Sequence, residues 1–266
     1  MISLRYHLLS LVSVFLALAI GILIGSAFVM RADLRSISQR LQKEFSEVRE
    51  EVRKERETSR QIEAILGNYR RFAQSVIPLL VRGRLAGQRI GIIYIGNVED
   101  KVISELEETI EAAGGQVSFL ISLLPSQIRN LSEGYEEFFV SLSNDLLWGN
   151  KRGLEYLAGQ NLINIKSWQG TTTKLLVISD KEADKNRVKE IDIPLISNLL
   201  NNGFKVVGGE EFASSFSVIP YYKDQGISTI DCVDYEIGRI GVVLLLSGKE
   251  GNYGMRKGTD ALLPPL

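Results

Sequence analysis

Hydrophobic and polar positions follow three different patterns along the 266-residue chain. The first is a run from His7 to Met30 that contains no formally charged side chain. As a helix this run would reach about 36 Å, which exceeds the roughly 30 Å of a bilayer's hydrocarbon core. Apolar residues on every helical face are typical of a membrane span. Residues 1–30 therefore predict an N-terminal transmembrane helix.

A cleaved signal peptide is the alternative interpretation of this segment. Gly25-Ser26-Ala27 offers small residues that suit a cleavage site. The apolar run is nevertheless longer than the roughly 7–15 residues of a signal-peptide core. We therefore prefer an uncleaved signal anchor that crosses the membrane once.

Small residues recur at every fourth position of the same segment. They form one narrow stripe, made of Ser13, Ala17, Gly21 and Gly25. Such a stripe lets two helix backbones approach closely in lipid, although small residues are also common in membrane helices generally. We expect a pairing face, because the next segment predicts a homodimer independently.

Residues 31–80 carry the second pattern, in which dense charges of both signs surround a regular set of apolar positions. The apolar seam consists of Leu34, Ile37, Leu41, Phe45, Val48, Val52, Ile62, Leu66, Tyr69, Ala73 and Val76. Steps of three and four are typical of a coiled-coil stalk, and a solvated single helix is the alternative. Glu55 and Ser59 occupy the seam and weaken it. Pro78 is expected to end or kink the helix.

Residues 81–266 show the third pattern, in which short apolar runs alternate with helical periodicity. Strands are predicted at Arg89–Ile95, Gln116–Ile121, Lys174–Ser179, Phe204–Val207, Ser228–Val233 and Arg239–Leu246. Helices are predicted at Lys101–Ala113, at about 193–201 and over most of 126–168. This alternation predicts an α/β domain with a mostly parallel, doubly wound (Rossmann-like) sheet of five or six strands and helices on both faces.

Composition narrows the chemistry mainly through what the chain lacks. The formal net charge is −1, so charge gives no argument for a nucleic-acid partner. The single histidine, His7, lies in the predicted span, and the single cysteine is Cys232. A histidine-based triad, a Cys/His zinc site and an internal disulfide are therefore excluded from the α/β domain. No GxGxxG or P-loop motif is present, and we expect no enzyme activity.

Acidic residues follow several of the predicted strands. They are Glu99, Asp100, Asp180, Asp231 and Asp234. Ligands of open α/β sheets gather at the carboxyl ends of the strands. Carboxylates at strand ends also cap helices and form turns, and this structural role is the expected one here. A cryptic enzyme or ligand sensor is the alternative.

Three stretches together resemble the mycobacterial copper transport protein B family. They are Met1–Gly25, Asp231–Gly241 and Gly251–Pro264. Family-like positions in the last stretch are Tyr253, Gly254, Gly258, Asp260, Leu262, Leu263 and Pro264. Lys257 stands where a proline is commoner in that family. The resemblance implies an envelope protein of copper transport or copper homeostasis whose C-terminal domain lies outside the cytoplasmic membrane.

The charges that flank the span predict the opposite orientation. Before the span lies Arg5, and after it lie Arg31, Arg35, Arg40 and Lys43. Counted strictly, the positive-inside rule places the C-terminal side in the cytoplasm. The margin is modest, and we follow the orientation that the resemblance implies.

Copper requires ligands that are scarce in this sequence. Copper(I) favours thiolates and thioethers, and copper(II) favours imidazoles. Cys232 and Met255 are the only soft ligands of the α/β domain, so a Cys232–Met255 pair is the metal-site hypothesis. A core cysteine and a packing methionine form the preferred alternative.

A competing function needs no metal. A dimeric coiled-coil anchor would recruit or regulate a protein partner in cell-envelope assembly or cell division. Copper binding separates the two hypotheses.

Overall fold

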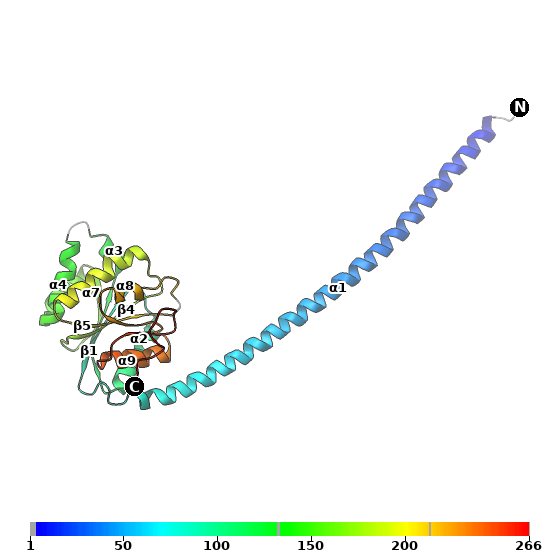
Figure 1. Cartoon of the computed structure of the whole chain (residues 1–266). Coiled ribbons are helices and arrows are strands. Elements are labelled where there is room, and N and C mark those ends of the chain that lie inside the picture. Colours follow the sequence, from blue (N-terminus) through cyan, green and yellow to red (C-terminus); the bar gives the residue numbers. More distant parts are fainter. Residues whose placement is uncertain (1–3, 132–133, 213, 266) are drawn as a thin grey trace. The chain divides into compact units, whose positions relative to one another are not determined.

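The computed structural model describes two compact units, which divide between Asn68 and Tyr69. The described residues are 4–131, 134–212 and 214–265, without the side chains of 4–6, 27–39, 70 and 74. Figure 1 shows a long helix followed by a layered α/β domain. Each unit is described below by itself.

Helix α1 runs from Leu4 to Val81 (Figure 1). Its segment His7–Ser26 has a mean hydropathy of 2.7 and is long enough to cross a membrane. The predicted apolar N-terminal helix is therefore present and is a candidate membrane span. All described side chains of this segment are exposed.

The predicted seam lies exposed along the stalk part of α1. Leu41, Phe45, Val48 and Val52 are 40–64% exposed, although all four are large apolar side chains. Ile62 and Leu66 are also exposed. The side chains of Leu34 and Ile37 lie outside the described residues. The coiled coil itself stays a prediction.

The last turns of α1 belong to the second unit and correct one expectation. Pro78 does not end the helix, which continues to Val81. Ile77 and Val81 are buried in the domain core, and this packing holds the final turn despite the hydrogen bond that proline cannot donate. The turns that follow contain Gly83 and Gly87 at positive φ.

The described part of the domain contains a sheet of seven strands in the order β3-β2-β1-β4-β5-β6-β7. The strands are β1 Arg89–Ile95, β2 Gln116–Leu123, β3 Ile163–Trp168, β4 Lys174–Ser179, β5 Lys205–Glu210, β6 Ser228–Ile230 and β7 Asn252–Tyr253. All neighbours are parallel except β2 and β3. The predicted mostly parallel α/β sheet is therefore confirmed. The expected number of five or six strands was wrong, because the sequence analysis did not predict β3 and the two-residue strand β7.

Helices connect the strands in most crossovers. They are α2 Asp100–Ala112, α3 Pro125–Arg129, α4 Tyr135–Trp148, α5 Lys151–Gly159, α6 Lys185–Arg187, the π-helical turn η1 Val188–Asp192, α7 Ile193–Asn201, α8 Ile219–Lys223 and α9 Glu236–Leu246. Helices α2 and α7 lie within one residue of their predicted bounds.

Two hydrophobic cores cover the two faces of the sheet. Ile93 and Ile95 of β1 belong to a core with α4, α5 and α7. The alternate residues Ile92 and Tyr94 belong to a second core with α2, α9 and the end of α1. This alternation follows from the period of two along a strand.

Two predictions about individual elements were wrong. Arg239–Leu246 is part of helix α9, because a short apolar run cannot distinguish a buried strand from a buried helix. Nearly every side chain of α9 is buried, so it shows no amphipathic period. Residues 163–168, expected to be helical, form the antiparallel strand β3. Trp168 of β3 stacks on Phe119 with ring centroids 5.3 Å apart.

Candidate functional site

Strands β1, β4, β5 and β6 end at one edge of the sheet, which we call the carboxyl edge. The strand order reverses between β1 and β4, and open α/β sheets bind ligands at such a point. In this domain the side chain of Asp180 lies in the crevice between the ends of β1 and β4. Its Oδ2 accepts a 2.7 Å hydrogen bond from the Asn97 amide. A Cβ atom added at Gly96 would overlap the Asp180 carboxylate, so the carboxylate occupies the crevice.

A buried arginine holds Asp180 in place. The Arg187 guanidinium pairs with Asp180 Oδ1 and donates to Ser179 Oγ. Its Nε lies 3.4 Å from Asp192 Oδ1. Arg187, Asp180 and Asp192 are each less than 5% exposed. An ion group this deeply buried is destabilised strongly by the loss of one partner, because the remaining charges have no solvent.

Tyr222 completes this group from helix α8. Its hydroxyl donates a 2.7 Å hydrogen bond to Asp192 Oδ2. Burial raises the pKa of the Asp192 carboxyl, and the Arg187 charge acts in the opposite direction. Burial and the neighbouring Asp192 raise the pKa of Tyr222 well above its ordinary value. The hydroxyl therefore stays a donor. The group links the end of β4 to α6, η1 and α8.

A second buried carboxylate, Glu210, ends strand β5. It accepts 2.7 Å hydrogen bonds from the Ser217 hydroxyl and the Val218 amide. Arg256 Nε lies 2.9 Å from Glu210 Oε1. Burial raises the pKa of Glu210, while these donors act against that rise. Glu210 therefore anchors the loop after β5 and the C-terminal segment to each other.

Asp231 shapes the family-like C-terminal segment. Its two carboxylate oxygens accept hydrogen bonds of 2.7 and 2.8 Å from the amides of Met255 and Arg256. Gly254, at φ +138°, approaches so closely that a Cβ there would overlap the Asp231 carboxylate. Asp260 likewise accepts a 2.8 Å bond from the Asn252 amide. These carboxylates hold turns, which is the structural role expected from the sequence.

The candidate copper ligands lie in adjoining segments but in different environments. Cys232 is fully buried, at φ +62°, whereas Met255 is 39% exposed. Burial raises the pKa of the Cys232 thiol far above its usual value, and the hydrogen bond with Asp231 raises it further. Metal binding needs the thiolate, so this environment opposes copper at Cys232. Whether the pair binds copper stays a prediction.

The carboxyl edge carries further acidic groups, of which Glu99 is exposed and Glu211 is buried. Glu99 pairs with Lys181 at 2.9 Å, and this ammonium lowers the pKa of Glu99. Burial raises the pKa of Glu211, and the charge of Asp234 raises it further. Among the described residues, no group of three or more His, Cys, Asp or Glu side chains is arranged to hold a metal ion.

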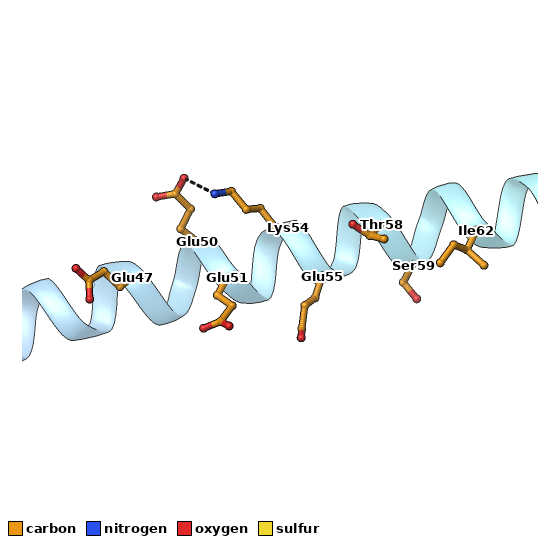
Figure 2. Close-up of a pocket in the computed structure, with 8 residues that line it drawn as sticks. All are labelled: Glu47, Glu50, Glu51, Lys54, Glu55, Thr58, Ser59 and Ile62. Carbon is orange, nitrogen blue, oxygen red and sulfur yellow. Dashed lines mark ion pairs between the residues drawn. The ribbon is translucent and has the colours of Figure 1, made fainter.

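The stalk presents a charged surface and not an enclosed site. Figure 2 shows side chains of one stretch of α1 lining an open hollow. They are Glu47, Glu50, Glu51, Lys54, Glu55, Thr58, Ser59 and Ile62. The Glu50–Lys54 pair spans 3.6 Å and is mostly solvent-exposed, so water screens it.

The small-residue stripe of the candidate span is open along its length. Ser13 and Ala17 are exposed, and no atom lies within 4 Å of a Cβ built at Gly21 or Gly25. The Ser13 hydroxyl is satisfied within the helix by the Ser10 carbonyl at 2.8 Å. The stripe therefore offers a face that a second helix can approach closely.

Sequence reasoning missed the partners of the strand-end carboxylates. Arg187, Asp192 and Glu210 are buried, and they come from segments that carried no motif. The available signal was weak: Asp192 directly precedes the apolar run of α7. The pairing of Arg256 with Glu210 joins residues 46 positions apart, and spacing along the chain cannot predict such a contact.

Comparisons with known proteins agree with the resemblance at the chain ends. The chain is 30% identical over 123 residues to proteins named copper transporter MctB from Mycobacterium bovis and Mycobacterium tuberculosis. That match covers 46% of this chain and 38% of each relative, so the chain spans well under half of the relatives' length.

A family model covers much more of the chain. The model described as copper transport outer membrane protein, MctB, matches residues 1–133 and 149–264. The unmatched residues between these ranges are essentially those of helix α4. The matched ranges include the candidate span, the sheet and the C-terminal segment around Asp231. The chain therefore belongs to the MctB family of copper transport proteins.

Proposed function

We propose that this chain is a single-pass, membrane-anchored envelope protein that takes part in copper transport or copper homeostasis. Family membership over both matched ranges is the observation that carries the proposal. The span His7–Ser26 supports membrane anchoring. The α/β domain lies on the extracytoplasmic side in this proposal, as the family description implies.

The α/β domain acts in this proposal as a non-enzymatic module. The strand order and the two cores support a doubly wound, Rossmann-like arrangement. The crevice in which such sheets bind ligands is filled by Asp180. Burial of Cys232 and the raised pKa of its thiol disfavour the thiolate that copper binding needs. We therefore place no direct copper-binding role on Cys232 and Met255.

Deletion of the chain from its cells tests this function. The proposal predicts a higher cellular copper content and lower copper tolerance, measured by metal analysis and growth. Wild-type chain, Cys232→Ser and Met255→Leu should each restore both readouts. Unchanged copper content and tolerance after deletion would contradict the copper function. Failure of only the two variants would instead place copper at that pair.

A homodimeric scaffold is the second proposed role, and it is compatible with the first. The exposed apolar seam of the stalk supports it, since Phe45 and Val48 are 64% and 55% exposed in a single copy. A coiled coil would bury these side chains against a second copy. The small-residue stripe would bring the same two chains together in lipid.

Two matched alanines test pairing through the stripe. Ala17 lies on the stripe and Ala19 lies on the opposite face of the helix. We expect Ala17→Ile to reduce copurification of two differently tagged copies, because the bulkier side chain separates the backbones. The Ala19→Ile control should copurify as wild type does. Equal behaviour of the two variants would argue against the stripe.

A further inference from the structure

The edge of the sheet opposite the carboxyl edge contains a hollow of about 700 Å³, which we call the amino-edge hollow. It is lined by the first residues of β4, β5 and β6, the end of α9 and the loop from Gly248 to Asn252. Its volume falls within the roughly 300–1,000 Å³ range of small-molecule sites. The hollow lies entirely within the α/β domain.

Lysines gather around this hollow. Lys174, Lys205, Lys223 and Lys249 line it, against a single acidic residue, Glu250. Lys174 and Lys205 are direct neighbours in the register of β4 and β5. The chain as a whole has a net charge of −1, so this positive charge is a local feature and not a consequence of composition.

The four lysines lack counterions in the described part of the chain. No ion pair joins any of them to a carboxylate, although six other lysines of the described residues are paired with nearby acids. The Lys174 ammonium donates to Gln88 Oε1 at 2.6 Å and to the Leu246 carbonyl at 3.2 Å. Burial lowers the pKa of Lys174, and the charge of Lys205 lowers it further. An anion at this place would relieve that repulsion.

Apolar residues line the same hollow beneath the lysines. Leu200, Phe204 and Ile227 contribute to it. Phe204 and Ile227 belong to the core that packs against α4 and α7, and the half-buried Leu200 packs against the same core. A few polar groups placed around an apolar lining are typical of small-molecule sites. The combination fits a ligand with an apolar body and an anionic end.

We propose that the amino-edge hollow binds a small amphipathic anion of the phosphate-monoester class. The phosphate lies among Lys174, Lys205 and Lys223, and the apolar body lies against Leu200 and Phe204, which pack in the same core. This site is separate from the carboxyl edge and goes beyond the proposed role in copper homeostasis.

Calorimetric titration of the full chain in phosphatidylcholine nanodiscs tests the site, with 2-naphthyl phosphate as the probe. We expect saturable binding of one probe per chain. Inorganic phosphate and 2-naphthol should each bind at least about tenfold more weakly, since each lacks one half of the recognition. Equal affinity for inorganic phosphate and the probe would overturn the role of the apolar lining.

Matched lysine variants locate the binding. Lys205→Ala/Lys223→Ala removes two exposed ammonium groups and should weaken probe binding about tenfold or more. Lys185→Ala/Lys189→Ala removes two exposed lysines outside the hollow and should leave the affinity unchanged. Absence of saturable binding, or an equal loss in both double variants, would overturn the proposal.

Competition then separates two sources of the same chemistry. Displacement of the probe by vesicles that contain phosphatidic acid, whose headgroup is a phosphate monoester, but not by phosphatidylcholine vesicles, would support the site with a lipid headgroup as its anion. Displacement by phenyl phosphate alone would support it with a soluble ligand. Competition by phosphatidylcholine as strong as that by either anion would contradict anion recognition.

Discussion

The stalk and the α/β domain use similar side chains in opposite environments. In the stalk the Glu50–Lys54 pair is mostly exposed, and the apolar seam from Leu41 to Leu66 has no cover within one chain. In the domain Arg187 and its acidic partners are buried. The domain therefore buries this ion group and its two apolar cores within one chain, whereas the stalk would need a second surface to bury its seam.

The largest expected effect is on the buried ion group of the domain. Arg187→Ala would leave Asp180 and Asp192 buried without their counterion. We expect a loss of about 3–5 kcal/mol in the free energy of unfolding, measured by chemical denaturation. Arg152→Ala, at an exposed position without an ion pair among the described residues, is the control and should change little. Similar losses in both variants would contradict the account.

A smaller effect is expected at the crevice between β1 and β4. Gly96→Ala forces a positive φ on alanine and places a methyl group against the Asp180 carboxylate. Gly203→Ala has the same backbone constraint, at φ +81°, but open space around the added atom. Gly96→Ala should therefore lose about 1–3 kcal/mol more than this control. Equal thermal and chemical stability of the two variants would show that the crevice is not filled as described.

A pH dependence of stability is expected from Glu210. Burial raises the pKa of Glu210 in the folded chain above its unfolded value. Its contribution to stability is therefore fully present below the unfolded pKa and is lost as pH rises through the folded pKa. Glu210→Gln removes this titration while keeping the side-chain volume.

Chemical denaturation at several pH values from about 4 to 7 measures the difference in the free energy of unfolding between the wild type and Glu210→Gln. The wild type should lose stability relative to the variant as pH rises. A constant difference, or a change of opposite sign, would contradict the raised pKa.

The domain could be predicted from the sequence better than its site. The runs Arg89–Ile95 and Lys174–Ser179 gave β1 and β4 with their observed bounds, because each is a short apolar run that ends at a turn. The prediction of a strand at Arg239–Leu246 was wrong, because burial on all sides removes the helical period that would distinguish α9 from a strand. Strand β3 was not predicted, because it lies at the sheet edge and has few buried residues.

The candidate site depended on contacts between distant segments. Asp180 and Asp231 were identified as strand-end carboxylates, yet their partners Arg187 and the amides after Gly254 followed only from the structure. The structural role of these carboxylates was the preferred interpretation, and their hydrogen bonds agree with it. Cys232 and Met255 were chosen by ligand chemistry alone, which says nothing of burial. The sequence therefore could not predict that Cys232 is buried and Met255 is exposed.

The central claim is that a second copy covers the exposed seam of the stalk, and disulfide trapping tests it most directly. Val48→Cys places a thiol on the seam, and Glu50→Cys places one on the opposite face of the helix. The native Cys232 is fully buried, which disfavours its own crosslinking. In membranes under mild oxidation, we expect disulfide-linked dimers with Val48→Cys and few with Glu50→Cys. Equal crosslinking at the two positions, or none at either, would contradict the claim.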